Sequence, residues 1–122
     1  MARLLKLSHK SLDAWKEAML LLKLTYKETS FFPLVERYGL TAHCRKTATS
    51  IVSNIAEGAS RKTMKEKARF FEIARSSLVE LDTQFEIAES LGYMNHHSTE
   101  RLVSSFGKTF ALISGLIKAN RK

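Results

Sequence analysis

The sequence predicts an all-α fold, an antiparallel up-down four-helix bundle. Apolar residues recur at spacings of three and four in four separate stretches, which is the pattern of a buried helix face. Only one proline and five glycines occur among 122 residues, which leaves little material for the many turns of a β fold. The length suits one hydrophobic core. We expect residues 1–10 to be an N-terminal extension and residues 11–122 to form a single four-helix-bundle domain.

The first helix is expected to run from about residue 12 toward residue 32. Ser11 can cap its start, and Pro33 prevents its continuation because proline has no backbone N–H and a fixed φ. A short connector, residues 33–39, follows. The predicted core stripe of this helix consists of Leu12, Trp15, Met19, Leu22 and Tyr26.

The second helix is expected to begin with Thr41 as its N-cap. Gly58 stands where a left-handed C-terminal cap is needed, so we expect the helix to end there after about fifteen residues. The predicted core stripe consists of Cys44, Ala48, Ile51, Val52 and Ile55.

The third helix is expected to be nearly thirty residues long. Thr63 and Glu66 have the spacing of a capping box at its start, and the pair Leu91 and Gly92 closes it. Its core stripe keeps strict heptad spacing, with Phe71, Ala74, Leu78, Leu81, Phe85 and Ala88.

A fourth helix follows the polar turn of residues 95–98, with an inward stripe of Leu102, Phe106, Phe110, Ile113 and Ile117. Apolar residues also lie off the main stripes of the first and third helices. A face wider than one core requires indicates a second buried surface, most simply a subunit interface. Wide buried faces within one compact bundle are the alternative. The residues concerned are Leu20, Leu21, Leu24, Phe70, Ile73 and Ile87.

Positive charge is the second prominent feature of the chain. Lys and Arg number 20 against 12 Asp and Glu, for a net charge of +8, and such an excess favours nucleic acid, an anionic membrane or an acidic protein as partner. The third helix is basic in its first turns and acidic in its second half, the reverse of what its dipole prefers. A basic patch for a ligand at one end of the molecule would explain this arrangement, and so would head-to-tail pairing between subunits. We interpret the basic residues as a phosphate-binding surface formed by Arg45, Lys46, Arg61, Lys62, Lys65, Lys67, Arg69 and Arg75.

The junction between the second and third helices has two alternative interpretations. Residues 55–60 look like the turn of a helix-turn-helix, but the two flanking helices are too long for a short recognition helix. Arg61 can pair with Glu57 instead of meeting a ligand. We expect Asn54, Glu57 and Gly58 to be structural, with Asn54 bonded to Glu57, to a neighbouring helix or to the backbone around Gly58. Few exposed aromatic residues are evident for base stacking.

No pattern in the sequence indicates catalysis, a cofactor or a metal. Glutamates followed by a histidine three residues later, which di-iron bundles use, are missing, and the adjacent His96 and His97 point apart in a turn. Cys44 is the single cysteine and is expected in the core, which fits a reducing cytoplasm. The longest apolar runs are shorter than a membrane span, so we expect a cytoplasmic protein without membrane contact.

Four segments resemble a known family: residues 12–18, 32–41, 50–58 with Arg61, and 71–81. They are similar to the bacterial four-helix-bundle proteins, which include proteins encoded by intervening sequences in 23S ribosomal RNA genes. The most specific piece is Asn-Ile-Ala-Glu-Gly-x-x-Arg at residues 54–61. The chain departs from the family at His43, where glutamine is usual, and at Ser76, where glycine is usual.

The resemblance implies a bundle that assembles as a ring-shaped homopentamer without catalytic residues. It also implies a more distant relative, the accessory variability protein of diversity-generating retroelements, a basic pentamer that binds a reverse transcriptase and nucleic acid. We therefore expect a non-enzymatic, oligomeric protein that binds RNA or a ribonucleoprotein through its basic surface. The alternatives are an accessory subunit that docks on a reverse transcriptase and an oligomeric scaffold without a nucleic-acid role.

Overall fold

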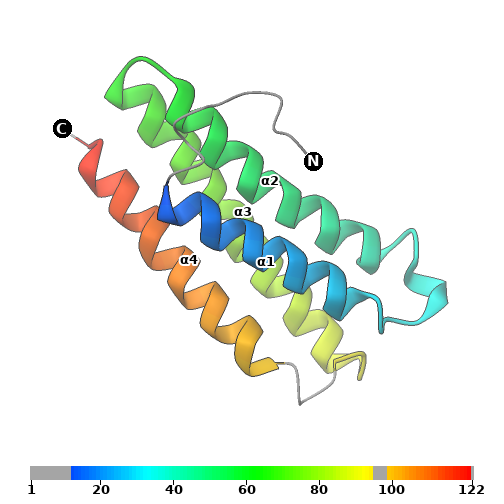
Figure 1. The fold of residues 1–122 in the computed structure, drawn as a ribbon. Helices are drawn as coiled ribbons and strands as arrows, with labels where there is room; N and C mark the ends of the chain where they lie inside the picture. Colours follow the sequence, from blue (N-terminus) through cyan, green and yellow to red (C-terminus); the bar gives the residue numbers. More distant parts are fainter. Residues whose placement is uncertain (1–11, 95–98, 122) are drawn as a thin grey trace, which may run out of the picture.

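The computed structural model describes residues 12–94 and 99–121, and within them it contains helices and no strand. The helices are α1 (Asp13–Thr29), α2 (Leu40–Ser60), α3 (Met64–Ser90) and α4 (Thr99–Ala119), with a short 3₁₀ helix η2 (Leu34–Glu36) between α1 and α2. Each long helix runs antiparallel to the one before it (Figure 1). α2 packs on α1 and α3, and α4 packs on the same two helices. The predicted all-α four-helix bundle is confirmed.

The stripes predicted for α2 and α3 form the centre of the core. All six heptad residues of α3 are buried, and so are Cys44, Ala48, Ile51 and Ile55 of α2, while Val52 is half-buried at the edge. Both helices are long, with 21 residues in α2 and 27 in α3. This length and the close packing of the two helices favour a bundle over a helix-turn-helix.

The stripe predicted for α1 is wrong by a rotation of about one residue. The buried positions include Ala14, Ala18, Leu21 and Thr25, whereas Tyr26 is exposed. Small alanines let the neighbouring helices approach closely. The Thr25 hydroxyl donates to the Leu21 carbonyl at 2.8 Å, so a polar residue is buried without losing a hydrogen bond. Leu12, Trp15, Met19 and Leu22 are half-buried along the flanks of this face.

The stripe predicted for α4 contains one error of the same kind. Leu102, Ile113 and Ile117 are buried, and Phe106 makes an edge-to-face contact with Phe85 at 5.9 Å between ring centroids. Phe110, however, is 46% exposed. Its inward place is taken by the fully buried Thr109, whose hydroxyl donates to the Ser105 carbonyl at 2.7 Å. Local bonding of the threonine hydroxyl again removes the cost of burying it.

The start of α2 also differs from the expectation. Thr41 lies inside the helix and is not the N-cap, because the helix begins at Leu40. A carboxylate oxygen of Glu36, in η2, accepts a hydrogen bond from the Leu40 N–H at 3.1 Å. The other oxygen accepts from the Tyr93 hydroxyl at 3.0 Å, which raises the pKa of Tyr93. One glutamate thus ties the helix start to the end of α3. The proposed α1 cap, Ser11, lies outside the described residues, as do His96 and His97.

Both ends of α3 match the sequence. The Thr63 hydroxyl accepts from the Glu66 N–H at 3.1 Å and also contacts the Glu66 carboxylate at 3.1 Å. At the other end Gly92 has a φ of +78°, which glycine adopts without strain. The Tyr93 N–H donates to the Ala88 carbonyl at 2.9 Å and the Gly92 N–H to the Glu89 carbonyl at 3.0 Å, which is a Schellman motif.

One described helix, α4, is long and apolar enough to cross a membrane by length and composition alone, with a mean hydropathy of 1.2 in its most apolar window. The expectation that every apolar stretch is too short for a span is therefore wrong for this helix. A core helix of a soluble bundle meets the same criterion. Here α4 buries one face, centred on Thr109 and Ile113, against α1 and α3.

Candidate nucleic-acid interface

The turn between α2 and α3 lies at the end of the bundle where α4 also ends (Figure 1). α2 finishes at Ser60, and the extended residue Arg61 bonds back through its N–H to the Gly58 carbonyl at 3.2 Å. α3 starts three residues later at Met64. The up-down topology therefore gathers basic residues of α3 and of the segment that follows α4 at one end.

Half of the predicted phosphate-binding residues are engaged within the protein. In each case the positive group contacts a protein oxygen, an aromatic ring or both. Arg45 donates to the Thr29 hydroxyl at 2.9 Å and lies over the Tyr26 ring at 4.6 Å. Arg61 pairs with Glu57 at 2.9 Å and lies over the Phe70 ring at 4.6 Å.

The other two engaged residues hold pairs of helices together. Lys67 donates from Nζ to the Ala59 carbonyl at 2.8 Å, so it caps the C-terminal end of α2 with a positive charge. Arg75 donates to the Ser114 hydroxyl at 3.2 Å and so links α3 to α4. These contacts account for the two residues without any ligand.

The eight predicted residues do not form one surface. Arg45 and Lys46 precede Arg61 by at least fifteen residues of continuous helix, which is roughly 22 Å at 1.5 Å per residue. Arg75 lies further along α3 and faces α4. The structure brings together only the part of the predicted set that surrounds the α2–α3 turn.

Lys62, Lys65 and Arg69 are exposed around this turn and have no hydrogen bond or ion pair to another residue in the described part of the chain. A fourth cation, Arg121, follows α4 and is not among the residues predicted from the sequence. We call Lys62, Lys65, Arg69 and Arg121 the basic end. The sequence feature that could have identified Arg121 is the Arg-Lys pair at residues 121–122. In an up-down bundle the end of the fourth helix lies beside the turn between the second and third helices.

A groove of about 820 Å³ runs across the basic end between α3 and the residues that follow α4. Lys65, Arg69 and Arg121 contribute positive charge to it, and Glu72 opposes them through an ion pair with Arg121 at 3.4 Å. The remaining lining residues are Met64, Glu66, Ala68 and Asn120. An open groove of this kind can contact a phosphate chain but does not enclose a small molecule.

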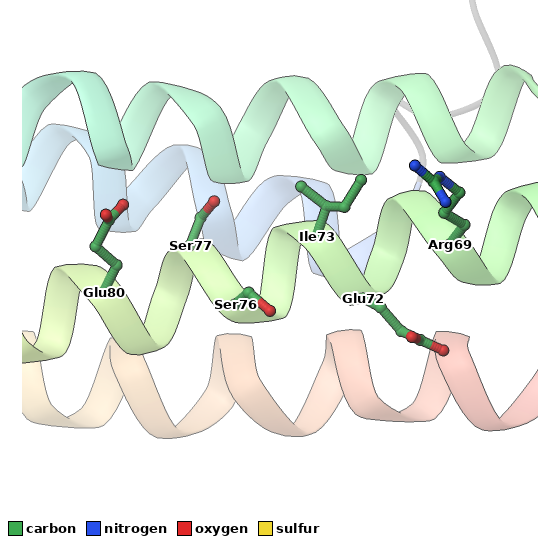
Figure 2. Close-up of a pocket in the computed structure, with 6 residues that line it drawn as sticks. All are labelled: Arg69, Glu72, Ile73, Ser76, Ser77 and Glu80. Carbon is green, nitrogen blue, oxygen red and sulfur yellow. The ribbon is translucent and has the colours of Figure 1, made fainter.

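A second depression, of about 500 Å³, marks where the positive surface ends on α3. All six residues that line it come from this helix, and Figure 2 shows Arg69, Ser77 and Glu80 pointing toward α2 while Glu72 points toward α4. Arg69 is the single cation of the set. The carboxylates of Glu72 and Glu80 disfavour phosphate contact further along α3 than Arg69. The candidate interface therefore stops within the first two turns of this helix.

Gly58 has a different role from the one predicted. It lies inside α2, which continues to Ser60, so it is not a left-handed cap. A Cβ added at Gly58 would lie 2.7 Å from Cε1 and 2.9 Å from Cδ1 of Phe71. Glycine is needed here because the Phe71 ring of α3 packs directly on the α2 backbone.

The partner expected for Asn54 was also wrong. Its amide donates to the Ser50 carbonyl at 2.8 Å and to the Ser50 hydroxyl at 3.1 Å, one turn earlier in α2. Ser50 in turn contacts the Ser77 hydroxyl of α3 at 3.2 Å. The short polar chain of Asn54, Ser50 and Ser77 therefore links α2 to α3, as a structural role requires, while the expected pairing of Arg61 with Glu57 is confirmed.

The described residues contain no group of three or more His, Cys, Asp or Glu side chains placed to hold a metal ion. Cys44 is fully buried, as expected, and burial raises the pKa of its thiol to about 11. A thiol with this pKa is a poor nucleophile at neutral pH because the thiolate is the reactive form.

We expect Cys44 to be protected from thiol reagents in the folded protein. At pH 8 the native chain should react at least 100-fold more slowly with an aromatic disulfide than the chain in denaturant, since both access and thiolate fraction are reduced. The unfolded thiol ionises near its ordinary pKa of 9 and the folded one near 11. Unfolding thus releases a proton between these values, and this residue's contribution to stability is lost there as pH rises. Rapid native-state labelling would contradict the buried position.

The expectation of few exposed aromatic residues was wrong. Phe31 and Tyr38, in the connector between α1 and α2, are both largely exposed. The connector lies at the end of the bundle opposite the basic end (Figure 1). The exposure of these two rings was not predicted, because Pro33 and Gly39 indicate a connector but do not indicate which of its side chains remain in solvent.

Two comparisons with known proteins bear on this chain. A family model described as 23S rRNA-intervening sequence protein matches residues 10–115. A search of curated proteins found no significant match. The matched segment includes the four helices almost completely and the whole α2–α3 turn, but it stops before Arg121.

Proposed function

Because the chain belongs to the 23S rRNA-intervening sequence protein family, we propose that it is a non-enzymatic, oligomeric protein that binds RNA through phosphate contacts at its basic end. The observation that carries this proposal is the gathering of Lys62, Lys65, Arg69 and Arg121 at one end of the bundle, from the α2–α3 turn, the start of α3 and the segment that follows α4. The family name links such proteins to ribosomal RNA genes, and RNA is the polyanion that this link favours.

Helix stability does not account for these charges. The positive end of the α3 dipole lies at its N-terminus, where each basic side chain costs a few tenths of a kcal/mol. Lys65 and Arg69 are one turn apart, so they lie on the same side of the helix. Basic side chains at this position destabilise the isolated helix, and their presence is explained if a bound polyanion neutralises their charge.

Contacts of this type recognise the phosphate backbone and not the base sequence. Phosphate contacts bring affinity and salt dependence but little sequence information. The two most exposed aromatic rings, Phe31 and Tyr38, lie at the far end of the molecule, away from the proposed path of the RNA. We therefore expect binding that tolerates many RNA sequences and weakens steeply with salt.

We expect the variant Lys62→Gln, Lys65→Gln, Arg69→Gln, Arg121→Gln to bind RNA at least 10-fold more weakly than the parent at 100 mM salt. The measurement is a mobility shift with a fluorescent single-stranded RNA at several salt concentrations. Four phosphate contacts per subunit correspond to a slope of about −3 in log K against log salt, and most of that slope should disappear in the variant.

The matched control is Lys23→Gln, Lys27→Gln, Lys46→Gln, Lys108→Gln, which removes the same number of positive charges from exposed positions elsewhere. This control should retain most of the parent's affinity. Equal weakening in both variants would assign binding to net charge and not to the basic end. The absence of any shift by the parent at low salt would contradict RNA binding and would favour a scaffold or a subunit that docks on another protein.

The oligomer is supported by exposed apolar side chains. Leu34 and Val35 on the connector, and Val79 and Phe110 between α3 and α4, are all at least 46% exposed, and groups of large exposed apolar residues mark interaction surfaces. The resemblance to ring-forming family members points the same way. A ring would repeat the basic end in every subunit, so that several weak phosphate contacts act together on one RNA.

A further inference from the structure

The connector between α1 and α2 presents a group of large apolar side chains to solvent. Phe31 is 60%, Leu34 80%, Val35 85% and Tyr38 85% exposed. We call these four residues the tip. Single exposed apolar residues are common on protein surfaces, but a contiguous group within eight positions marks a binding surface.

The tip is held in a fixed conformation by the residues between its members. Phe32 is buried, with its ring centroid 6.4 Å from that of Phe85 and 5.7 Å from that of Tyr93. Backbone bonds from Glu36 to Pro33 and from Arg37 to Leu34, at 2.9 and 3.0 Å, close η2. A preorganised apolar protrusion loses little conformational entropy when it binds, which is the property of an interface anchor.

A matching recess lies elsewhere on the same chain, between α3 and α4. It has a volume of about 310 Å³ and is lined mainly by apolar residues. A Cβ added at Gly107 would meet nothing within 4 Å, so this glycine leaves its part of the recess open. The lining consists of Leu78, Val79, Asp82, Phe106, Gly107 and Phe110, and we call it the α3–α4 groove.

We propose that the tip of one copy of this chain docks in the α3–α4 groove of a second copy. Among residues 12–94 and 99–121, both surfaces are apolar and unpartnered, and one protrudes where the other is recessed. Their charges are also complementary, because Arg37 stands exposed on the tip, over the Tyr38 ring at 5.5 Å, and Asp82 lines the groove. This inference rests on the oligomer in the proposed function and identifies its contact surfaces.

The geometry of such a contact determines the kind of assembly. Tip and groove are different surfaces, so each copy uses its tip on one neighbour and offers its groove to another. A heterologous contact of this kind closes into a ring when the rotation permits and otherwise runs on as a filament. The basic end takes no part in it and stays available to RNA.

Unpaired RNA bases are the rival occupant of the tip, since Phe31 and Tyr38 present aromatic faces. Three observations favour a second copy. Leu34 and Val35, which are among the most exposed members, have no aromatic face on which a base can stack. The groove supplies an apolar counterpart with a volume of about 310 Å³. The tip also lies at the opposite end of α2 from the basic end, about 30 Å away along a helix of 21 residues.

Two variants test the proposal, one with substitutions in the tip and one with a substitution in the α3–α4 groove. Leu34→Asp with Val35→Asp places charge on the tip, and Gly107→Gln fills the groove at a position where the fold has room. Each variant alone should sediment mainly as the 13.8 kDa monomer at concentrations where the parent is oligomeric. An equimolar mixture should form a one-to-one dimer and nothing larger, because the intact tip of the Gly107→Gln chain can enter the intact groove of the other variant.

A charge exchange tests the pairing of Arg37 with Asp82. Arg37→Asp and Asp82→Arg should each weaken assembly, and the double variant should restore it to near the parent level. The matched control is Ile73→Asp, an exposed apolar position on α3 outside the groove, which should leave the oligomer intact. Circular dichroism of every variant should show the helix content of the parent.

The other results each overturn the proposal in a recognisable way. A parent that is monomeric at all concentrations refutes the oligomer itself, while the mobility shift still reports on the basic end. If both the tip variant and the Gly107→Gln variant still form the parent oligomer, only this interface is refuted. Loss of RNA binding by the tip variant with assembly unchanged would assign the tip to bases.

Discussion

We expect Gly58→Ala to destabilise the protein by about 2 kcal/mol, although alanine is the better helix former. The new methyl carbon would lie 2.7 Å from the buried Phe71 ring and 3.1 Å from Cβ of Phe70. Contacts this short force α2 and α3 apart or the ring out of its position, and overpacking of this kind costs about 1–3 kcal/mol. The gain from replacing a helical glycine, about 0.5–1 kcal/mol, offsets only part of that cost. Urea denaturation followed by circular dichroism measures the difference.

Gly115→Ala is the matched control for this prediction. Gly115 also lies inside a helix, α4, but an added Cβ there meets open space and it does not line the α3–α4 groove. The same substitution should therefore stabilise the protein by about 0.5–1 kcal/mol. In a double-mutant cycle, Phe71→Leu should cost less in the Gly58→Ala background than in the parent, because the smaller side chain relieves the clash. Equal effects of the two glycine substitutions would contradict a close approach at Gly58.

Leu21→Ala should be among the most damaging single truncations in α1, at about 3–4 kcal/mol. Leu21 is fully buried at the centre of the core, whereas the phase predicted from the sequence placed it off the main stripe. Truncation of a buried leucine to alanine loses transfer free energy and leaves a cavity, with measured costs of about 2.7–5 kcal/mol. Denaturation at a fixed pH measures the loss, and the native far-ultraviolet spectrum confirms that the variant still folds.

The neighbouring Leu20→Ala supplies the control, since Leu20 is 38% exposed on the same helix. Its truncation should cost less than about 1 kcal/mol. A larger effect at Leu20 than at Leu21 would show that α1 is rotated relative to the structure. Such a result would support the core face predicted from the sequence, which consists of Leu12, Trp15, Met19, Leu22 and Tyr26.

Sequence reasoning succeeded for α2 and α3 because their inward positions carry large or small apolar side chains at strict heptad or helical spacing. It failed for the phase of α1 and for Phe110 of α4. In both helices, threonines occupy buried positions while bulky aromatic residues occupy the flanks. A threonine hydroxyl that bonds the carbonyl one turn earlier loses its polar character, and a hydropathy pattern does not record that local bond.

The candidate interface was predictable in charge but not in shape. Lys62, Lys65 and Arg69 follow from the local excess of basic residues alone. That Arg45 and Arg75 are engaged in helix–helix contacts, and that Arg121 joins the basic end, depends on contacts between residues far apart in the chain. Linear proximity to a basic cluster does not distinguish a solvated cation from one that holds two helices together.

The number of α-helices, the buried faces of α2 and α3 and the net positive charge follow from the sequence, because each depends on composition or on spacing within a single helix. Four other properties depend on the tertiary structure: which side of α1 faces inward, why glycine is required at position 58, which cations are engaged, and which apolar residues stay exposed at the tip. These properties arise where two helices meet. Their outcome is set by the van der Waals distance between side chains of different helices, such as the Phe71 ring against the α2 backbone, which no periodicity within one helix encodes.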